Sequence, residues 1–454
     1  MTDLPDLDDI HEELLDRIPE DRVEPTVARV ARVMELLGDP QRGPRIVHVT
    51  GTNGKTSTAR MIETLLVATG LRVGLFTSPH LHSVTERIRI DGAPIDPQRL
   101  VEVHEDIRAI LAMVDAEQEA DGGIPLTYFE AVTCLAFAAF ADAPVDVAIL
   151  EVGMGGTWDA TNVAQADVAV VTPVSLDHSQ YLGNTPAEIA AEKAGIVEPG
   201  SIAVIGPQPS DVLDVLLGAC ARAGAEPRVF GRDFDLVSCQ LAVGGQVLTM
   251  RTAAGTYDEV FLGLHGRHQA DNAVVAVAAV EALLVSDDPL DTALVDALGS
   301  ATSPGRLEAV RRDPTVLLDA AHNPAGAQAL AAALQESFVF LDTTLVIGVS
   351  EDKDIRGILA PLREMADRVI ATRSPSARAA SPQSIADVAE ELWGPAAVSI
   401  EPDVPSAVTA AMRHAEQTGG GVVVTGSVFT VAAAQEALAE PGPVGDDEGP
   451  EGLV

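Results

Sequence analysis

One stretch constrains the fold of this chain more than any other, namely residues 46–70, IVHVTGTNGKTSTARMIETLLVATG. A short apolar run comes first, a turn through Gly51 and Gly54 follows, and a pattern typical of a helix starts near Lys55. Glycines allow a turn tight enough for several backbone N–H groups to face one anion, and a helix start adds the positive end of its dipole. The stretch therefore predicts a phosphate-binding loop between a strand and a helix.

The loop is not the common Walker A motif, because Val49 stands where that motif has a glycine. It has the shorter form G-T-N-G-K-T-S, in which Lys55 is placed to reach the β- and γ-phosphates and the Thr56 hydroxyl to bind Mg²⁺. The alternative is an ordinary glycine-rich turn with a surface lysine. The residues predicted to bind ATP here are Gly51, Thr52, Asn53, Gly54, Lys55, Thr56 and Ser57.

The charge of the chain excludes some classes of partner. There are 68 acidic and 29 basic residues, for a net charge of −39, and no long basic run. Such a surface repels nucleic acid and anionic membranes. The acidic N-terminus has no apolar signal segment, and no apolar run reaches membrane-spanning length. We therefore expect a cytoplasmic protein with small-molecule partners.

Lysine is rare in this chain, which contains only Lys55, Lys193 and Lys353 among its 29 basic residues. A guanidinium neither offers a compact point charge nor deprotonates to a neutral, nucleophilic amine. Each remaining lysine is therefore expected where arginine cannot serve. The three cysteines, Cys134, Cys220 and Cys239, are widely spaced in apolar surroundings and predict buried, reduced thiols.

The order of predicted elements indicates an α/β protein with two domains. Residues 1–40 have a helical pattern, apolar strands then alternate with helices up to about residue 206, and residues 228–262 are β-rich. After a linker at 298–308, a strand-loop-helix rhythm returns. We predict an ATP-binding domain with a mainly parallel sheet flanked by helices (1–302), a smaller Rossmann-like domain (303–440) and a disordered acidic tail (441–454).

Three polar residues follow apolar strands of the first domain: Ser78, Glu151 and His178. The ends of parallel strands meet at one edge of a sheet, so these residues are expected beside the phosphate loop. Together they form a plausible Mg²⁺ set, although histidine is an unusual ligand for so hard an ion. Taken singly, they could instead be a cap before Pro79, a paired interior acid and a hydrogen-bonded core histidine.

Ten motifs, in unbroken order over about residues 26–435, resemble those of bacterial folylpolyglutamate synthase/dihydrofolate synthase, a family in the Mur ligase superfamily. The resemblance implies that ATP phosphorylates a carboxylate of folate or dihydropteroate, that the amino group of L-glutamate attacks the acyl phosphate, and that the enzyme is a monomer. A second domain would bring glutamate and close to exclude water. The motifs are VTGTNGKTS, FTSPHL, EVGMGGTWDATN, SLDHSQYLGNT, IAAEKAGI, GRHQADNA, PGRLE, LDAAHNP, SEDKD and TGSVF.

The resemblance assigns roles to individual residues. Ser78, Glu151 and His178 match the metal ligands of the family. Lys193 matches a lysine carried as a carbamate, which arginine could not form; the alternative for Lys193 is a surface ion pair with Glu188 or Glu192. The residues implied in catalysis are Lys55, Lys193 and His322.

The remaining implied roles concern the nucleotide and the incoming glutamate. Asn272 resembles an adenine-facing asparagine, Arg306 a linker arginine that reaches the phosphates, and Asp319 a nucleotide contact from the second domain. His322 and Ser427 fall where glutamate is held. Lys353 positions its loop, or forms a plain ion pair with Asp352 or Asp354.

Pterin contacts are implied for two segments, and the chain departs from the family at two points on this side. Thr127 and Phe129 match a substrate-lining segment, although an aromatic residue there could be core. At the N-terminal stretch the family often has Gly-Leu-Glu/Asp-Arg, and after EVGMGG it often has Arg-Leu. Both departures concern dihydropteroate, and the matching residues here are Thr26, Val27, Ala28 and Arg29 for the first and Thr157 and Trp158 for the second.

Two other interpretations remain open. A Mur-type ligase of cell-wall synthesis would share the phosphate loop, but only about 45 residues precede that loop, too few for a UDP-binding domain. A nucleotide-gated binding protein or an inactive relative would use the loop as a switch. Such a protein would hydrolyse ATP slowly without pterin or glutamate.

Overall fold

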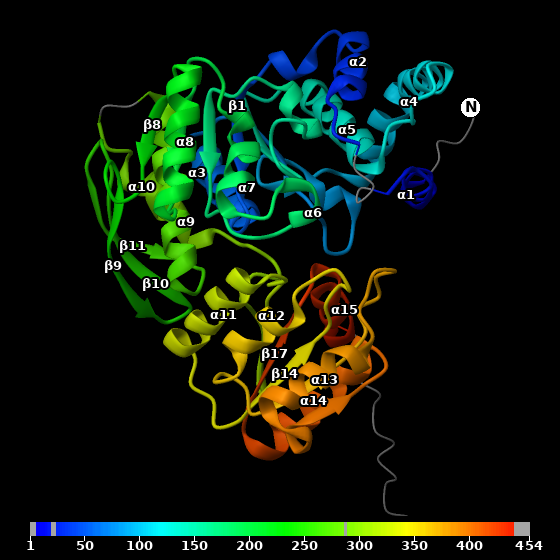
Figure 1. Cartoon of the computed structure of the whole chain (residues 1–454). Coiled ribbons are helices and arrows are strands. Elements are labelled where there is room, and N and C mark those ends of the chain that lie inside the picture. The colour runs from blue at the N-terminus through cyan, green and yellow to red at the C-terminus, as the bar shows by residue number, and fades with distance from the viewer. Residues whose placement is uncertain (1–5, 20–23, 286–287, 440–454) are drawn as a thin grey trace, which may run out of the picture. The chain divides into compact units, whose positions relative to one another are not determined.

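A computed structural model describes residues 6–19, 24–285 and 288–439. The chain divides into two compact units (Figure 1). The first contains the chain up to Pro304 together with Ala332–Phe338, and the second contains Gly305–Ala331 and the chain from Val339 onward. The predicted acidic tail, 441–454, lies outside the described residues.

The first unit is organised around an eight-stranded sheet with the order β4-β3-β2-β5-β1-β6-β7-β8. Strands β2, β5, β1, β6, β7 and β8 run parallel, whereas β3 pairs antiparallel with both β2 and β4. The expected mainly parallel sheet is thus confirmed. Its strands are β1 (Arg45–Thr50), β2 (Val73–Phe76), β3 (Ile88–Ile90), β4 (Ala93–Pro94), β5 (Val147–Glu151), β6 (Val168–Val171), β7 (Ile202–Ile205) and β8 (Glu226–Val229).

One face of this sheet shares a core with three helices and a small antiparallel sheet. Val47 and Val49 of β1 point into this core, as the alternation of side chains along a strand requires. The small sheet has the order β11-β10-β9 and corresponds to the predicted β-rich segment. These elements are α3 (Lys55–Ala68), α9 (Arg267–Leu284), α10 (Thr292–Val295), β9 (Asp235–Ala242), β10 (Gly245–Arg251) and β11 (Thr256–Leu262).

The opposite face is covered by the remaining helices of the unit. Ile46 of β1 packs there with the N-terminal helices, and Val171 of β6 packs with the helices that follow it. Capping residues define several helix starts; Thr185, for example, forms a capping box with Glu188. The helices are α1 (Leu7–Leu15), α2 (Ala28–Leu36), α4 (Pro97–Ala120), α5 (Tyr128–Asp142), α6 (Ser179–Leu182), α7 (Pro186–Lys193) and α8 (Ser210–Ala223).

Two expectations from the sequence need correction in this unit. Residues 1–40 do not form one helical segment, because α1 ends at Leu15 and α2 begins only at Ala28. The N-cap residue Val27 makes no side-chain hydrogen bond to α2. The burial of Val30 and Val33 in the core therefore stabilises this helix more than its N-cap residue does. Cys134 and Cys220 are buried as free thiols, whereas Cys239 is only half-buried and its thiol lies 2.9 Å from Gln246 Oε1.

The second unit has a six-stranded sheet with the order β12-β13-β17-β14-β15-β16. Only β12 is antiparallel to its neighbour, so the expected Rossmann-like pattern of strands and helices is confirmed. Among the described residues, no helix combines the length and apolar character needed to cross a membrane. The elements are β12 (Glu308–Arg312), β13 (Thr315–Leu318), β14 (Thr343–Ile347), α12 (Ile355–Leu362), β15 (Arg368–Ala371), α13 (Pro382–Trp393), β16 (Val398–Ile400), α14 (Val404–Thr418), β17 (Gly421–Thr425) and α15 (Val428–Ala439). Helix α11 (Pro324–Ser337) begins in this unit, and its residues from Ala332 onward belong to the first.

Candidate active site

The candidate site lies at the carboxyl ends of the central strands of the first unit. Strand β1 is flanked by β5 on one side and β6 on the other, and all three run parallel. The chain continues from β1 to β2 on one side of β1 and from β5 to β6 across it, so β1 marks the switch point where doubly wound sheets bind their ligands. The loops after β1, β5 and β6 therefore meet at one edge.

The phosphate loop after β1 requires its glycines. Gly51 has a φ of +145°, and a Cβ atom there would lie 1.9 Å from Thr172 Oγ1. Gly54 has a φ of +84°, and a Cβ atom there would lie 2.8 Å from Asn272 Oδ1. Both positions combine a conformation that favours glycine with a close approach to a neighbouring element. The loop is thus held between the end of β6 and the start of α9.

The loop after β6 supports the phosphate loop, which the sequence analysis did not foresee. Thr52 N and Asn53 N both donate to Pro173 O, at 2.9 and 3.3 Å. Thr52 Oγ1 donates to Ser175 O and accepts from Ser175 N, both at 3.0 Å. The N–H groups predicted to bind an anion are therefore those of the first turn of α3. The sequence signal for this contact is the run Thr-Pro-Val-Ser (172–175), which directly follows an apolar strand.

Several predicted nucleotide residues lie together around the start of α3. Lys55 Nζ donates to Gly51 O and Thr52 O, each at 3.2 Å, which curls the side chain back over the loop. Asn272 of α9 is buried beside Gly54. Ser57 is buried, with its hydroxyl 3.0 Å from that of Ser303. The structure thus brings α3, α9 and the chain before the second unit to one place.

Glu151 is the centre of the predicted metal set. Its side chain at the end of β5 is only 1% exposed. Thr56 Oγ1 donates to Glu151 Oε1 at 2.9 Å, and Ser78 N donates to Glu151 Oε2 at 3.4 Å. A buried carboxylate with a hydroxyl beside a phosphate loop provides the oxygen ligands that Mg²⁺ prefers, so the residues present fit this ion.

His178, the third predicted ligand, occupies the loop after β6. It directly precedes α6 and has a left-handed φ of +47°, a backbone conformation that is uncommon for residues other than glycine. Its backbone N–H donates to Asp177 Oδ1 at 2.9 Å, and its ring nitrogen Nε2 lies 4.0 Å from the same oxygen. Its part in a metal site together with Glu151 stays a prediction.

Lys193 is buried at the end of α7, and its Nζ donates to Gly51 O of the phosphate loop at 2.7 Å. Burial, together with the positive charge of Lys55, lowers the pKa of the Lys193 amine to about 7. A surface ion pair with Glu188 or Glu192 is therefore the wrong interpretation. The structure instead shows a buried amine with a lowered pKa beside the predicted phosphate site.

The glycine-rich loop after β5 packs tightly against α7. A Cβ atom on Gly156 would lie 2.7 Å from Lys193 O, and one on Gly153 would lie 2.5 Å from the Phe129 ring. Thr157 N and Oγ1 donate to Glu192 O at 3.3 and 3.2 Å, while Trp158 packs on the core formed with α7 and α8. Thr157 therefore anchors this loop to the helix that carries Lys193.

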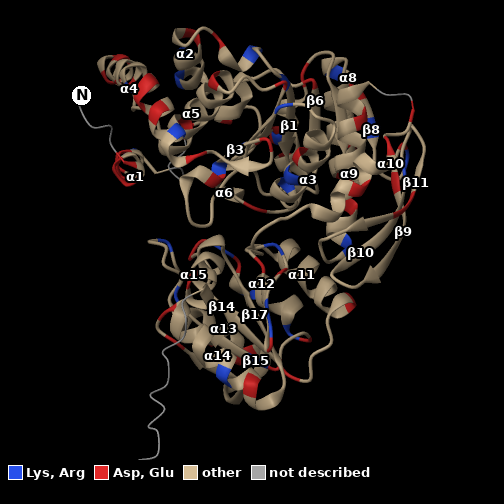
Figure 2. Ribbon diagram, turned by 180° about the vertical axis from the view of Figure 1, so that it is seen from behind, with Lys and Arg blue, Asp and Glu red and all other residues tan. Residues whose placement is uncertain are grey.

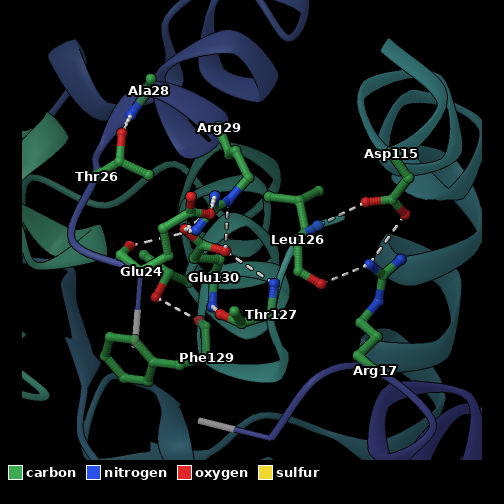
Figure 3. A network of polar contacts seen from close by, with 11 residues as sticks. Arg17, Glu24, Thr26, Ala28, Arg29, Asp115, Leu126, Thr127, Phe129 and Glu130 are labelled. Atoms are coloured by element: carbon green, nitrogen blue, oxygen red, sulfur yellow. Dashed lines mark hydrogen bonds and ion pairs between the residues drawn. The ribbon is translucent and has the colours of Figure 1, made fainter. Parts of the chain in front are cut away.

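An ionic network joins α2 and α5, the helices of the predicted pterin residues (Figure 3); Arg29 and Glu130 are buried, whereas Glu24 is half exposed. Arg29 Nη2 lies 2.9 Å from Glu130 Oε1, and Arg29 Nη1 lies 2.6 Å from Glu24 Oε2. Burial lowers the pKa of Arg29, but hydrogen bonds and charge attraction from Glu130 and Glu24 outweigh it and raise the pKa above its usual value. Thr127 caps α5 by accepting from Glu130 N at 3.3 Å.

This network indicates that the conformation of the N-terminal stretch is set by charge pairing. The ring of Phe129 lies 5.8 Å from that of Phe76, which places it over the end of β2. Val27 starts α2, and Ala28 N donates to Thr26 Oγ1 at 3.0 Å. Substrate contact by these residues stays a prediction.

In the second unit, the predicted residues lie on the loops after β13 and β17, two paired strands. Asp319 is buried, and its carboxylate accepts from Leu307 N at 2.8 Å and Ala321 N at 2.9 Å. Burial raises the pKa of Asp319, and the charge of Arg306 opposes that shift. Asp319 thus fastens the linker after Arg306 to the sheet.

The residues predicted to hold glutamate lie near one another. His322 Nδ1 is 2.9 Å from Ala320 O, and Gly426 N donates to Ala321 O at 3.1 Å, which joins the two loops. Ser427 is buried and its hydroxyl accepts from Thr430 N at 3.0 Å, so it caps α15. Lys353 lies elsewhere, with Nζ 4.0 Å from Asp352 Oδ2.

Comparisons with known proteins agree on one family. Residues 49–280 match the Mur ligase middle domain, and residues 305–428 match the Mur ligase, glutamate ligase domain. The dihydrofolate synthase/folylpolyglutamate synthase of Mycobacterium tuberculosis is 45% identical over 93% of this chain and 92% of its own length. The enzyme of the same name from Escherichia coli is 38% identical over 75% of each chain.

Solved structures are similar along the whole chain. The folylpolyglutamate synthase of Mycobacterium tuberculosis complexed with ADP superposes with a TM-score of 0.92 at 44% identity and covers 96% of this chain and 98% of its own. The Escherichia coli protein in complex with DHPP and ADP has a TM-score of 0.83 at 32% identity, with 96% and 98% coverage. The similarity therefore extends over both units, each with its own sheet.

Proposed function

This chain belongs to the dihydrofolate synthase/folylpolyglutamate synthase family of Mur ligases, and we propose that it joins L-glutamate to folates, and also to dihydropteroate, at the expense of ATP. The family resemblance expected from the motifs is confirmed. The chain is accordingly an ATP-dependent acid–amino acid ligase. The observation that carries the more specific proposal is the meeting of Thr56, Glu151 and Lys193 at the phosphate loop.

In this proposal the phosphate loop binds the triphosphate of ATP and places the γ-phosphate for attack by a substrate carboxylate. The N–H groups at the start of α3 and the Lys55 ammonium neutralise the phosphate charge. Thr56, Ser78, Glu151 and His178 would hold Mg²⁺, which supplies charge neutralisation between triphosphate and carboxylate. The glutamate amine then attacks the acyl phosphate, an amide forms, and phosphate leaves.

Lys193 is proposed to act as a carbamate. CO₂ adds to the neutral amine, the amine loses a proton, and a carboxylate-like group results. A lysine can do this only when its amine is available in the neutral form, and the lowered pKa of Lys193 provides that form near neutral pH. Its position 2.7 Å from Gly51 O supports a role close to the phosphates.

Glutamate binding is assigned to the second unit, at the adjoining loops that carry His322 and Ser427. Asn272 would face the adenine, with Arg306 and Asp319 completing the nucleotide site. The pterin would lie along Val27, Ala28, Arg29, Thr127 and Phe129, with Thr157 and Trp158 nearby. We further propose that the enzyme acts as a monomer in the cytoplasm.

The relatives support a folate substrate over a muropeptide. Two of the relatives described above are named for both folate activities, whereas the match to Mur ligases is at the level of two shared domains. Cell-wall ligation therefore remains the second candidate.

Phosphate release is the test. The assay contains ATP, Mg²⁺ and L-glutamate, with dihydropteroate or a reduced folate as the acceptor. Turnover with both acceptors supports the complete proposal. Turnover with folate alone would restrict the proposal to polyglutamylation. It would also explain why Thr26–Ala28 and Thr157–Trp158 differ from the residues common in the family. Absence of turnover with either acceptor would contradict the proposal.

A further inference from the structure

A cavity of about 320 Å³ lies within the first unit, along α3 beyond the phosphate loop. Its size is at the lower end of the range of ligand pockets. None of the residues assigned above to ATP, metal, pterin or glutamate lines it. The polar side chains that line it are Arg60, Glu63, Thr64, Arg89, Ser300 and Thr302.

Two arginines face this cavity, in a chain whose net charge is −39. Figure 2 shows basic residues on α3 in a molecule whose charged residues are mostly acidic. Arg89 is buried and already neutralised, because its Nε donates to both carboxylate oxygens of Glu63 at 3.1 and 3.0 Å. Arg60 has a different environment.

Among residues 6–19, 24–285 and 288–439, Arg60 makes one hydrogen bond, from Nε to Thr302 O at 3.0 Å. Within the described part of the chain, it makes no ion pair, and its two terminal nitrogens donate to no protein acceptor. A guanidinium carries five N–H donors in a rigid fork that matches phosphate or carboxylate oxygens two at a time. Four of those donors remain for a ligand in the cavity.

The charges around Arg60 do not satisfy this fork. Burial lowers the pKa of Arg60, and the nearby charge of Arg89 lowers it further, so the two cations repel one another across the cavity. Glu63 is paired with Arg89, and Glu151 accepts from Thr56. Glu86 attracts Arg60 only at a distance, because its carboxylate accepts the backbone N–H groups of residues 81, 82 and 83.

We propose that this cavity binds a phosphate group, at a site separate from the ATP phosphate loop. Among the residues that line the cavity, two guanidinium groups and one carboxylate give a net charge of +1, which suits a group that carries −1.5 to −2 near neutral pH better than a single carboxylate. The Thr64 hydroxyl donates to Arg60 O at 2.9 Å, and the Ser300 hydroxyl donates to Ala297 O at 2.8 Å. The lone pairs of both hydroxyls can therefore accept a hydrogen bond from a protonated phosphate oxygen.

Two segments connect this cavity to the phosphate loop, namely helix α3 and the residues that precede the second unit. Arg60 lies five residues beyond Lys55 on the same helix, and Thr302 directly precedes Ser303, whose hydroxyl meets that of Ser57 at 3.0 Å. Phosphate bound to Arg60 would therefore contact both α3 and the segment that leads to the second unit. The inference stands without the ligase proposal, since it needs only the cavity and its charges.

Calorimetric titration of inorganic phosphate into the full chain tests this site. Saturating ADP and Mg²⁺ occupy the phosphate loop, and ionic strength is held constant. The wild-type protein is expected to bind one phosphate, Arg60→Gln at least about ten-fold more weakly, and Arg60→Lys with an intermediate loss because it keeps the charge without the fork. Arg222→Gln, on the exposed side of α8, is the matched control and should bind as the wild type does.

Thermal denaturation shows whether each variant is folded. Equal phosphate affinity in wild type and Arg60→Gln would overturn the proposal, as would equal losses in Arg60→Gln and Arg222→Gln or the absence of any binding to the wild type. Wild-type affinity in Arg60→Lys would overturn the argument from the fork. Glutarate serves as the carboxylate probe, and tighter binding of glutarate than of phosphate would overturn the choice of phosphate.

Discussion

Replacing Lys193 with arginine tests the carbamate directly. With a pKa of about 7, roughly half of the Lys193 amine is neutral at pH 7, whereas an ordinary lysine with a pKa of 10.5 has about one neutral amine in 3,000. Burial and the positive charge of Lys55 thus raise the neutral fraction of this amine by a factor on the order of 10³. Arginine keeps a positive charge and cannot add CO₂.

Two measurements follow from this change. Carbon-13 NMR with labelled bicarbonate should show a carbamate signal in the wild type that Lys193→Arg lacks. Lys353→Arg is the matched control, because Lys353 is one of only two other lysines, and it should keep the signal. Turnover of Lys193→Arg should fall by about 10²–10³-fold, as for the loss of one group that stabilises charge in the transition state.

The reasoning fails under clear conditions. Identical NMR spectra of wild type and Lys193→Arg would refute the carbamate, and so would near-normal turnover of Lys193→Arg with intact folding. Stability gives an independent check in CO₂-free buffer. Because the folded-state pKa lies below that of the unfolded state, the unfolded chain binds the extra proton between about pH 7 and 10.5. The free energy of unfolding should therefore rise across this range, by at most about 1.4 kcal/mol per pH unit, and Lys193→Met should lack this rise.

Three further substitutions test the site and its supports. Gly51→Ala would place a Cβ atom 1.9 Å from Thr172 Oγ1, so we expect loss of ATP binding by calorimetry; Gly70→Ala, with nothing within 4 Å, controls for the left-handed backbone alone and should bind normally. Glu151→Gln should raise the Mg²⁺ concentration needed for half-maximal turnover, and an unchanged requirement would show that Glu151 is not a ligand. Arg29→Met should cost about 3–5 kcal/mol in urea denaturation because it leaves Glu130 buried without its partner; a loss below about 1 kcal/mol would contradict the buried-pair interpretation.

Local sequence patterns carried much of the fold. The apolar runs at β1, β5 and β6 predicted buried parallel strands, because a strand covered on both faces has no polar alternation. The glycine turn before α3 predicted the phosphate loop, since few other residues permit that backbone path. The rarity of lysine singled out Lys193 before any contact was known.

Other features depend on strand order, which no local pattern encodes. Lys193 lies 142 residues from Gly51, and their contact exists only because α7 returns to the end of β1. Arg29 pairs with Glu130, which lies 101 residues away in the sequence. A residue predicted to contact the substrate is therefore also part of a buried ion pair. Neither partner could be chosen from sequence, because many acidic residues were available to Arg29.

The sequence alone therefore predicted the kind of chemistry, and the tertiary structure decided the environment of the groups proposed to perform it. A glycine-rich turn, a carboxylate after a strand and a rare lysine are properties of short segments. The depth at which Lys193 is buried, the crowding of Gly51 by Thr172 and the unmatched fork of Arg60 depend on how distant segments pack. Burial and neighbouring charges shift the pKa values of these groups, and the placement of acceptors decides which donors are paired. Both effects follow from the three-dimensional arrangement of the elements.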